Sequence, residues 1–536
     1  MAAHPSAPDL LALRTRWTRL SGASDASPAA TSVRLLASYT VDPLVPYIGV
    51  PLHDAGVPAD LSVGPYHQIL QQCLDDASDT GRLRPDVLVV APRPEDYGDG
   101  DGRDLEEIAA AALAAAGRWR SCLVFVLPAV PEPRAHGVGD EGRRTGTAAS
   151  AAMVRERLRA MLANRPNVLL ADAEQAVRAV GARSAYRPVM YRVARVPYAE
   201  AVFEQLGRQL AGLLRLRLGG ARRAVVLDAA ALDPDALPEL RRPLELLRRR
   251  GHRLAVRVAD PGPRPAVRLA EALPELLADA RVELVADAAP LAEQLVSAAA
   301  RLRVAPASTV LLTAAGTDEE AGPAEVVRLG PEPAAWAADL EAAGLLDALP
   351  APEDPGDAVH REPRSAAEPS EAGGGRVSLA DFIEGLGVEV TFHEVDRALD
   401  DSTSELVARA HDFTLGENRP PHPSGPGFSV AARVRDRLGD YGTGAVAAVH
   451  YADAVARLDV FSVSCPAMGR GVEERVLREV VARADGEGCH TVLVEYEETG
   501  RNRVTADFLS AAAERTWQGP SGRELRMTVV RKEAVR

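Results

Sequence analysis

From Val33 to Leu349, short apolar runs alternate with stretches of helical periodicity, and this alternation limits the chain to few folds. A strand, a helix and a second strand in that order form parallel pairs, so the pattern predicts parallel sheets covered by helices. Strands are predicted at residues 33–38, 86–92, 121–128 and 167–172, and then at 222–228, 252–260, 281–287 and 309–315. We therefore expect two α/β domains, residues 33–218 and 219–349, after a flexible arm of residues 1–32.

Residues 350–376 separate these domains from the rest of the chain. Proline, glutamate, serine and glycine dominate this segment without periodicity, so it is predicted to be a disordered linker. Residues 377–536 then follow a different order, in which alternating strands precede a glycine-rich turn, a helix over 472–484, a strand over 490–498 and a last helix. This order predicts an α+β domain at the C-terminus of a multidomain α/β protein.

The composition excludes several classes of protein. The formal net charge is −14, which argues against a nucleic-acid partner, because such a partner requires a basic face. The four cysteines lack CxxC spacing, which excludes a disulfide scaffold or a cysteine-built zinc site and fits a reducing cytoplasm. No run approaches about 18 apolar residues and no signal-peptide pattern opens the chain, so we expect a cytoplasmic protein with no membrane partner. Lys532 is the only lysine, which nearly excludes mechanisms that need a buried lysine.

A glycine turn in the C-terminal part, SCPAMGRGVE (464–473), is the most informative local feature. Gly469 and Gly471 allow backbone N–H groups to crowd toward an anion at the N-terminus of the next helix, such as a phosphopantetheine phosphate. An ordinary strand–helix turn explains the same glycines. Cys465 precedes the turn, where a positive helix terminus would lower the thiol pKa and favour an acyl-accepting thiolate. The alternative is a small buried apolar residue.

Three other polar positions are candidates for chemistry. His411 and Asp412 are adjacent and would supply a general base or bind substrate. Helix capping or a solvent-exposed face accounts for the same two residues equally well. Asp228 ends an apolar strand, where parallel sheets place site residues. A single carboxylate is a poor magnesium site, so a strand-end cap is the favoured interpretation of Asp228.

Six segments carry a recognisable pattern: LLASYTVDPLVPYI (35–48), GPYHQILQQ (64–72), PDVLVV (85–90), RDRLGDYGTGAV (435–446), SCPAMGRGVEERVL (464–477) and TGRNRVTADF (499–508). Together they resemble the FkbH-like family of polyketide and non-ribosomal biosynthesis, whose C-terminal segments read DRFGDYG, SCRxxGRGVE and TxxN…F. The resemblance implies a flavodoxin/SGNH-hydrolase-like parallel-sheet domain, a haloacid-dehalogenase-like (HAD-like) Rossmannoid domain and a GNAT-like acyltransferase domain. Members of the family load a glyceryl unit from a phosphorylated donor onto an acyl carrier protein and remove the phosphate.

The resemblance also implies roles for individual residues. It places the phosphate of phosphopantetheine or CoA at Gly469, Arg470, Gly471 and Asn502, and Cys465 matches the family's turn. Cys465, His411 and Asp412 are the catalytic candidates, the last two on their residue types alone. Neither phosphopantetheine nor CoA would be tightly held, because each serves as the arm of a substrate. The implied partners are an acyl carrier protein and a small acyl donor.

The sequence departs from the HAD pattern Asp-x-Asp-x-Thr. Asp228 matches the first position, but Ala230 and Leu232 replace the second Asp and the Thr. Thr313 and its neighbours replace the later acidic pair, and no lysine lies between the motifs. With the magnesium ligands, the acid/base group and the cation missing, we expect no bound magnesium and no phosphatase activity.

The other domains depart as well. Pro466 replaces an arginine of the family's turn, which removes one phosphate contact and one backbone N–H. His411 and Asp412 stand where the family has polar amides. In the N-terminal region, His67 replaces the usual asparagine and Ser38 lacks a Gly-Asp-Ser motif, so no catalysis is assigned to this region.

The sequence therefore favours an acyl-handling protein that transfers an acyl unit to or from a carrier-protein thioester. In this interpretation Cys465 either carries the acyl group transiently or lies beside the thioester. The alternative is a catalytically degenerate scaffold or partner subunit that binds the carrier protein without turnover. A third, less favoured hypothesis is a hydrolase whose active site lies in the N-terminal domain.

Overall fold

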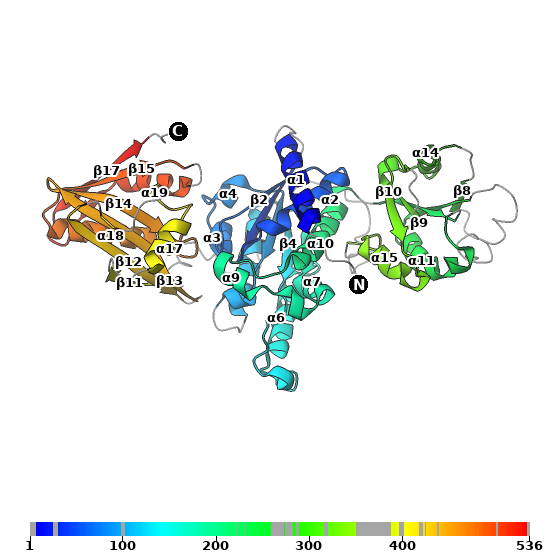
Figure 1. Ribbon diagram of the computed structural model, residues 1–536, viewed down its shortest axis with the longest axis horizontal. Coiled ribbons are helices and arrows are strands. Elements are labelled where there is room, and N and C mark those ends of the chain that lie inside the picture. The colour runs from blue at the N-terminus through cyan, green and yellow to red at the C-terminus, as the bar shows by residue number, and fades with distance from the viewer. Residues whose placement is uncertain are drawn as a thin grey trace.

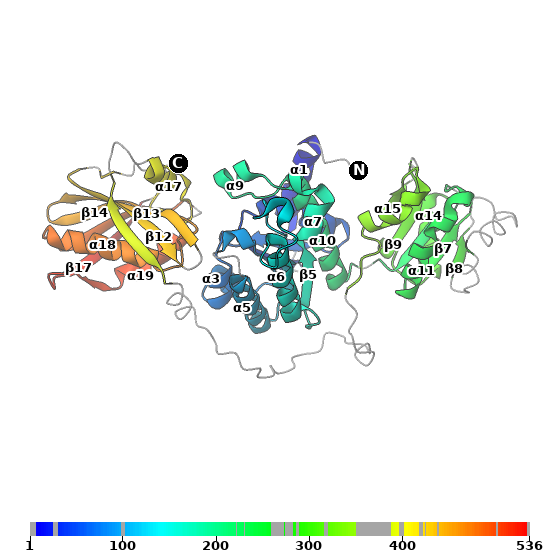
Figure 2. The same ribbon diagram turned by 90° about the horizontal axis from the view of Figure 1, so that it is seen from below.

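Three β-sheets organise the protein, each in its own body (Figure 1). The computed structural model describes residues 7–24, 30–97, 102–220, 222–229, 231–258, 273, 282–285, 289–315, 320–349, 387–395, 401–416, 422–423, 425–436, 439–499 and 502–532. The predicted linker, residues 350–376, lies outside them. Both views place the body of the first sheet between the other two (Figures 1 and 2).

The first sheet is entirely parallel, with strand order β2-β1-β3-β4-β5. Its strands are β1 (Thr31–Ala37), β2 (Ala59–Val63), β3 (Val87–Ala91), β4 (Cys122–Leu127) and β5 (Val168–Asp172). Every residue of β3 and β4 is buried, as expected for strands covered by helices on both faces. The helices are α2 (Val45–Asp54), α3 (Ile69–Leu74), α4 (Asp79–Leu83), α5 (Arg103–Trp119), α6 (Thr147–Leu162), α7 (Ala173–Val180), α8 (Ala182–Ala185), α9 (Pro188–Ala194) and α10 (Glu200–Leu218).

The N-terminal segment forms a docked helix, α1 (Ala7–Ser24), which corrects the expectation of a flexible arm. Trp17 of α1 packs so closely on α2 that a Cβ at Gly49 would lie 2.1 Å from its ring. Arg14 pairs with Glu200 at 3.4 Å, and Leu10 packs against the core beneath. The amphipathic face of α1 is therefore buried against the first domain, and this burial holds the segment in place.

The second sheet is also parallel, with strand order β10-β9-β6-β7-β8. Its strands are β6 (Ala224–Asp228), β7 (Arg253–Arg257), β8 (Val282–Val285), β9 (Thr309–Ala314) and β10 (Glu325–Leu329). The helices are α11 (Arg241–Arg249), α14 (Leu291–Arg301) and α15 (Trp336–Ala342). Two separate apolar clusters line the two faces of this sheet, so it too is a Rossmann-like layer between helices.

The third sheet is mixed, with strand order β11-β12-β13-β14-β15-β17-β16. Its strands are β11 (Glu389–Glu394), β12 (Gly427–Asp436), β13 (Gly439–Ala452), β14 (Val455–Val463), β15 (Thr491–Glu497), β16 (Thr516–Gln518) and β17 (Glu524–Lys532). The helices are α17 (Asp401–Arg409), α18 (Val472–Gly486) and α19 (Arg503–Ala513). The chain is thus a multidomain α/β protein with two parallel sheets and one mixed sheet.

Strands β14 and β15 separate toward their carboxyl ends. They pair only between Val455–Leu458 and Thr491–Val494. Beyond this point a segment around Thr414 enters the gap, because Val463 N–H donates to the Phe413 carbonyl at 3.1 Å and Glu497 N–H donates to the Leu415 carbonyl at 2.9 Å. The protein's own backbone therefore satisfies the strand edges that the separation exposes.

The first and C-terminal domains share one apolar core. His67 of the first domain stacks on Tyr97 at 5.0 Å between ring centroids and meets Tyr441 of the C-terminal domain edge-on at 6.2 Å. Within the described part of the chain, no helix is long and apolar enough to cross a membrane.

Candidate functional site

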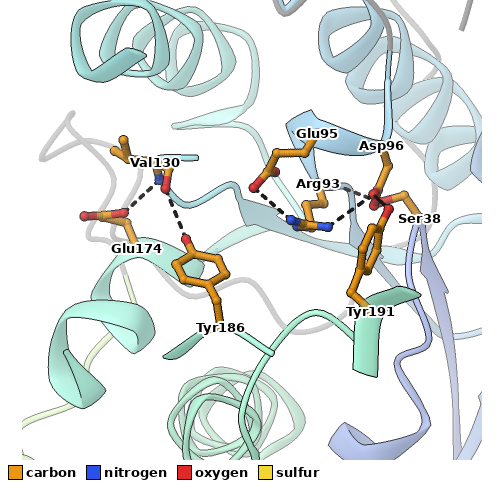
Figure 3. Close-up of polar contacts among 8 residues, drawn as sticks. All are labelled: Ser38, Arg93, Glu95, Asp96, Val130, Glu174, Tyr186 and Tyr191. Carbon is orange, nitrogen blue, oxygen red and sulfur yellow. Dashed lines mark hydrogen bonds and ion pairs between the residues drawn. The ribbon is translucent and has the colours of Figure 1, made fainter. Parts of the chain in front are cut away.

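Polar side chains gather at the carboxyl edge of the first sheet, where β1 and β3 end (Figure 3). The Ser38 hydroxyl, fully buried, donates to Asp96 at 2.7 Å and accepts the Arg93 backbone N–H at 2.9 Å. The Arg93 guanidinium lies between two carboxylates, 3.3 Å from Asp96 and 3.0 Å from Glu95. Burial raises the pKa of Asp96, and the Arg93 charge opposes that rise. The network is therefore a compact cluster in which one guanidinium faces two carboxylates.

Helix α9 supplies the outer wall of this cluster. The Tyr191 hydroxyl donates to Asp96, and the Arg93 guanidinium lies 4.5 Å from the centre of the Tyr191 ring (Figure 3). Farther along the same edge, Tyr186 donates to the Val130 carbonyl at 3.1 Å, and the Val130 N–H donates to Glu174 at 2.8 Å. These contacts fix the segment between α8 and α9 over the ends of the strands.

His67, like Arg93 at Nε, keeps a buried side-chain nitrogen without a hydrogen-bond partner at this edge. Its φ is +57°, it is 6% exposed, and its Nδ1 has no hydrogen-bond partner. Burial and the charge of Arg470 lower the pKa of the imidazole to about 3. The ring is therefore neutral at physiological pH. The sequence showed only that a histidine replaces the family's asparagine, and it gave no signal of this burial.

In the C-terminal domain, Cys465 of the glycine turn and Asp412, two separate candidates in the sequence, are in contact. The Cys465 thiol donates to Asp412 Oδ2 at 3.5 Å, and the thiol is partly exposed. Burial and then the Asp412 charge raise the thiol pKa to about 12. The predicted lowering of this pKa by the helix N-terminus is therefore wrong, because desolvation and a carboxylate neighbour outweigh the helix.

The remaining catalytic and binding candidates divide by their burial. His411 is exposed, and the Cys465 thiol is bonded to Asp412 instead of to this imidazole. Asn502 is fully buried: its amide donates to the carbonyls of Thr414 and Glu497, and its Oδ1 accepts from Tyr496. Asn502 thus clamps the segment inserted between β14 and β15, and its predicted contact with phosphate is not available.

The glycine turn has the backbone that its sequence predicts, with φ of +70° at Gly469 and +73° at Gly471. The Gly469 N–H, however, donates to Glu473 at 2.8 Å, so a carboxylate of the chain already occupies this donor. Arg470 is 1% exposed and pairs with Asp436 at 2.6 Å. Its predicted contact with phosphate is therefore replaced by a structural ion pair, which buries the guanidinium completely.

A cleft of about 870 Å³ lies between the first and C-terminal domains. From the first domain it is lined by Tyr39, Thr40, Tyr66, Gln68 and Gln71, among others. From the C-terminal domain it is lined by Asp412, Met468, Gly469, Glu473, Arg503, Val504, Asp507 and Phe508. Among the site candidates, Asp412 and Gly469 line the cleft. Cys465, His411, Arg470 and Asn502 lie outside its lining, so the cleft reaches Cys465 only through its partner Asp412.

Asp228 in the second domain has a different environment. Its side chain has no exposed surface, Oδ1 pairs with Arg257 at 2.9 Å and Oδ2 accepts the Thr313 hydroxyl at 3.0 Å. Leu232 is buried in the apolar core, and Ala230 lies outside the described residues. Magnesium requires several hard oxygen ligands with free lone pairs, so this donor set does not fit the ion. Among the described residues, no group of three or more His, Cys, Asp or Glu side chains is arranged for a metal.

The chain is similar in fold to solved structures. The crystal structure of the N-terminal part of the protein BF1531 from Bacteroides fragilis, described as containing a phosphatase domain complexed with Mg, matches with a TM-score of 0.51. The identity is 15%, and the match covers 61% of this chain and 96% of the other. At this identity the match is a likeness of fold alone. No family model matches the sequence, and no curated protein does.

Proposed function

We propose that the chain is an FkbH-like acyl-handling protein of natural-product biosynthesis, acting on a carrier-protein thioester in the cleft between the first and C-terminal domains. The observation that carries the proposal is the Cys465–Asp412 pair, of which Asp412 lines this cleft. The SGNH-like and GNAT-like assignments of the two domains belong to the same proposal. The likeness to a chain that contains a phosphatase domain fits this family in general.

In this proposal Asp412 is the proton acceptor and Cys465 lies beside the thioester. A thiol with a pKa of about 12 forms very little thiolate near neutral pH, so Cys465 itself is a poor acyl acceptor. The incoming phosphopantetheine thiol would give its proton to Asp412 as its sulfur bonds the acyl carbon. The bond from that carbon to the donor sulfur then breaks, and the donor leaves as a thiol after taking up a proton.

A phosphorylated donor is not required, because the second domain has no phosphate chemistry to offer. The Asp228 carboxylate is paired with Arg257 and closed to solvent, so it is not available as a nucleophile toward phosphate. We therefore expect a non-phosphorylated acyl thioester as donor and no magnesium-dependent turnover. Robust magnesium-dependent phosphatase activity that disappears in Asp228→Asn would contradict this part.

The decisive experiment mixes the protein with a holo acyl carrier protein and a panel of acyl thioesters and reads the intact masses of both proteins. We expect acyl addition to the carrier, a loss of about tenfold or more in Asp412→Asn, and most of the activity retained in Cys465→Ala. Asp60→Asn, an exposed carboxylate on β2, is the matched control. No acylation of the carrier with any donor would overturn the proposal.

A second function has specific support. The Gly469 amide and the Arg470 guanidinium, both predicted to hold phosphate, are engaged by Glu473 and Asp436. A protein whose phosphate contacts are internally satisfied would serve as a carrier-protein-binding scaffold without turnover. The same experiment separates the two, because a scaffold binds the carrier protein and leaves its mass unchanged.

A further inference from the structure

Helix α9 and its flanks form a basic and apolar surface in an otherwise acidic protein. Residues 175–199 contain five arginines and no aspartate or glutamate, whereas the whole chain has a net charge of −14. Arg183, Arg187 and Arg192 are exposed, and none of them forms an ion pair within the part of the chain that the structure describes. We call this surface, made by residues 183–195, the α9 surface.

Apolar side chains project from the same short helix. Val189 is 75% exposed, Val193 is 63% exposed and Met190 is 47% exposed. Helix α9 has only seven residues, so these side chains lie within two turns of one another and of Arg192. A patch that combines exposed apolar side chains with unpaired arginines is typical of a surface that binds a partner.

The other side of α9 is firmly held. Tyr191 donates to Asp96, the Thr40 N–H donates to the Arg195 carbonyl at 2.9 Å, and the Thr40 hydroxyl donates to the Ala194 carbonyl at 2.7 Å. The exposed side chains are therefore presented on a fixed backbone, and folding does not require them to be apolar. An apolar residue that is rigidly displayed and contributes nothing to the core needs another explanation, and binding supplies one.

The α9 surface lies beside the proposed site. Thr40, which holds the C-terminal end of α9, also lines the cleft between the first and C-terminal domains. In both views α9 is on the side of the first domain that faces the C-terminal domain (Figures 1 and 2). A partner bound at α9 would therefore stand at the edge of the cleft that contains Asp412.

We infer that the α9 surface docks an acidic helical face of a carrier protein, so that its flexible thiol-bearing arm reaches the cleft. Charge complementarity carries the choice of partner, because exposed arginines attract an acidic face and exposed Val and Met pack against an apolar residue within it. The identity of the partner rests on the proposed function. The position of the docking surface rests on α9 alone.

The test measures binding of a purified, acidic holo acyl carrier protein, labelled on its arm, by fluorescence anisotropy. We expect Arg187→Glu/Arg192→Glu to raise the Kd by about tenfold or more, Met190→Ala/Val193→Ala to raise it several-fold, and added salt to weaken the wild-type complex. Arg242→Glu/Arg249→Glu makes the same charge change on two exposed arginines of α11 and should leave the Kd unchanged within about twofold.

The outcomes separate this inference from the proposed function. Carrier binding that is equal in the α9 and α11 variants would overturn the docking surface alone. Acyl transfer to free pantetheine that survives the α9 reversal, while transfer to the carrier is lost, would support it. Absence of carrier binding would overturn both proposals. Loss of binding to phosphatidylglycerol vesicles or loss of self-association in the α9 variant, without any effect on the carrier, would assign the surface to a membrane or to a second copy.

Discussion

The first and second domains contain parallel sheets of five strands, and the carboxyl edges of these sheets differ in one respect. At each edge a polar residue follows a central strand: Ser38 after β1 and Asp228 at the end of β6. In the second domain both oxygens of Asp228 are engaged, by Arg257 and Thr313, and the side chain is closed to solvent. In the first domain, by contrast, the edge retains an unpartnered buried atom, His67 Nδ1, and lies next to a cleft.

Topology places polar groups at both edges, but it does not decide which of them can act. A carboxylate that is fully paired inside the protein offers nothing to a ligand. A site needs groups that are fixed in position and still able to form a contact, and in this chain such groups lie between the first and C-terminal domains. Measurements on both sheet edges can test two points. The edge of the second domain should be structural, and the edge of the first domain should contain polar groups without partners.

The largest effect is expected from breaking the Asp228–Arg257 pair. Arg257→Met leaves a buried carboxylate without its cation, which should lower the free energy of unfolding by about 3–5 kcal/mol. In the double variant Asp228→Leu/Arg257→Met no charge remains, and stability should return to about the wild-type value or exceed it. Thermal unfolding of the two variants checks this. A single variant as stable as the wild type would show that the pair is not the structural element described.

The next effect concerns the edge of the first sheet. Tyr191→Phe removes a donor to the buried Asp96 carboxylate, so we expect a loss of about 1.5–3 kcal/mol in urea unfolding. Tyr186→Phe is the matched control, since its hydroxyl donates to the neutral Val130 carbonyl and its loss should cost about 1 kcal/mol. Equal losses in the two variants would mean that the charge of Asp96 contributes nothing to the bond.

The pH dependence of stability distinguishes His67 from polar groups that are fully hydrogen-bonded, such as Asp228. Its folded pKa of about 3 lies below the ordinary histidine pKa of 6.5, so between these pH values the unfolded chain binds a proton that the folded chain does not. The contribution of His67 to stability is therefore complete above about pH 6.5 and falls as the pH drops toward 3, by at most about 1.4 kcal/mol per pH unit. His67→Phe should flatten this part of the curve. If the wild-type and variant curves are parallel below pH 6, His67 is not the group responsible.

Much of the architecture could be predicted from the sequence because it depends on local periodicity. The apolar runs before Ser38 and Asp228 are nearly continuous, and the structure makes both into buried strands of parallel sheets. The positive φ of Gly469 and Gly471 also follows from residue type. The docking of α1 could not be predicted, because Trp17 packs on a glycine of α2 that is 32 positions away in the sequence.

The site was harder to predict because partners distant in sequence decide what each polar group does. The spacing of the glycine turn gave no sign that Arg470 would form a buried ion pair with Asp436. It also gave no sign that the Asn502 amide would donate to the carbonyls of Thr414 and Glu497. Ser38 and Asp96 are 58 residues apart, so their hydrogen bond has no local signature. The cluster Arg-Pro-Glu-Asp after an apolar strand was the available signal, and it points only to a polar strand end.

The smallest effect concerns the Cys465 thiol, whose partner Asp412 lines the cleft. Removing the Asp412 charge in Asp412→Asn should lower the pKa of Cys465 and speed its alkylation at pH 8 by about threefold to tenfold, or about 1 kcal/mol. Iodoacetamide labelling followed by peptide mass analysis checks this, with Cys465→Ala to assign the signal and Asp60→Asn as the matched carboxylate control. An unchanged rate would show that Asp412 does not hold the thiol in its neutral form.

This measurement also decides between two uses of the same pair, because alkylation and acyl transfer respond to Asp412→Asn in different directions. If Cys465 accepts the acyl group, a more reactive thiol should acylate faster, so both rates rise together. If Asp412 takes the proton of an incoming thiol, alkylation of Cys465 accelerates while transfer to the carrier slows. The raised pKa of Cys465 favours the second result. Opposite changes in the two rates would therefore assign proton transfer to Asp412 and a neighbouring, non-covalent position to Cys465.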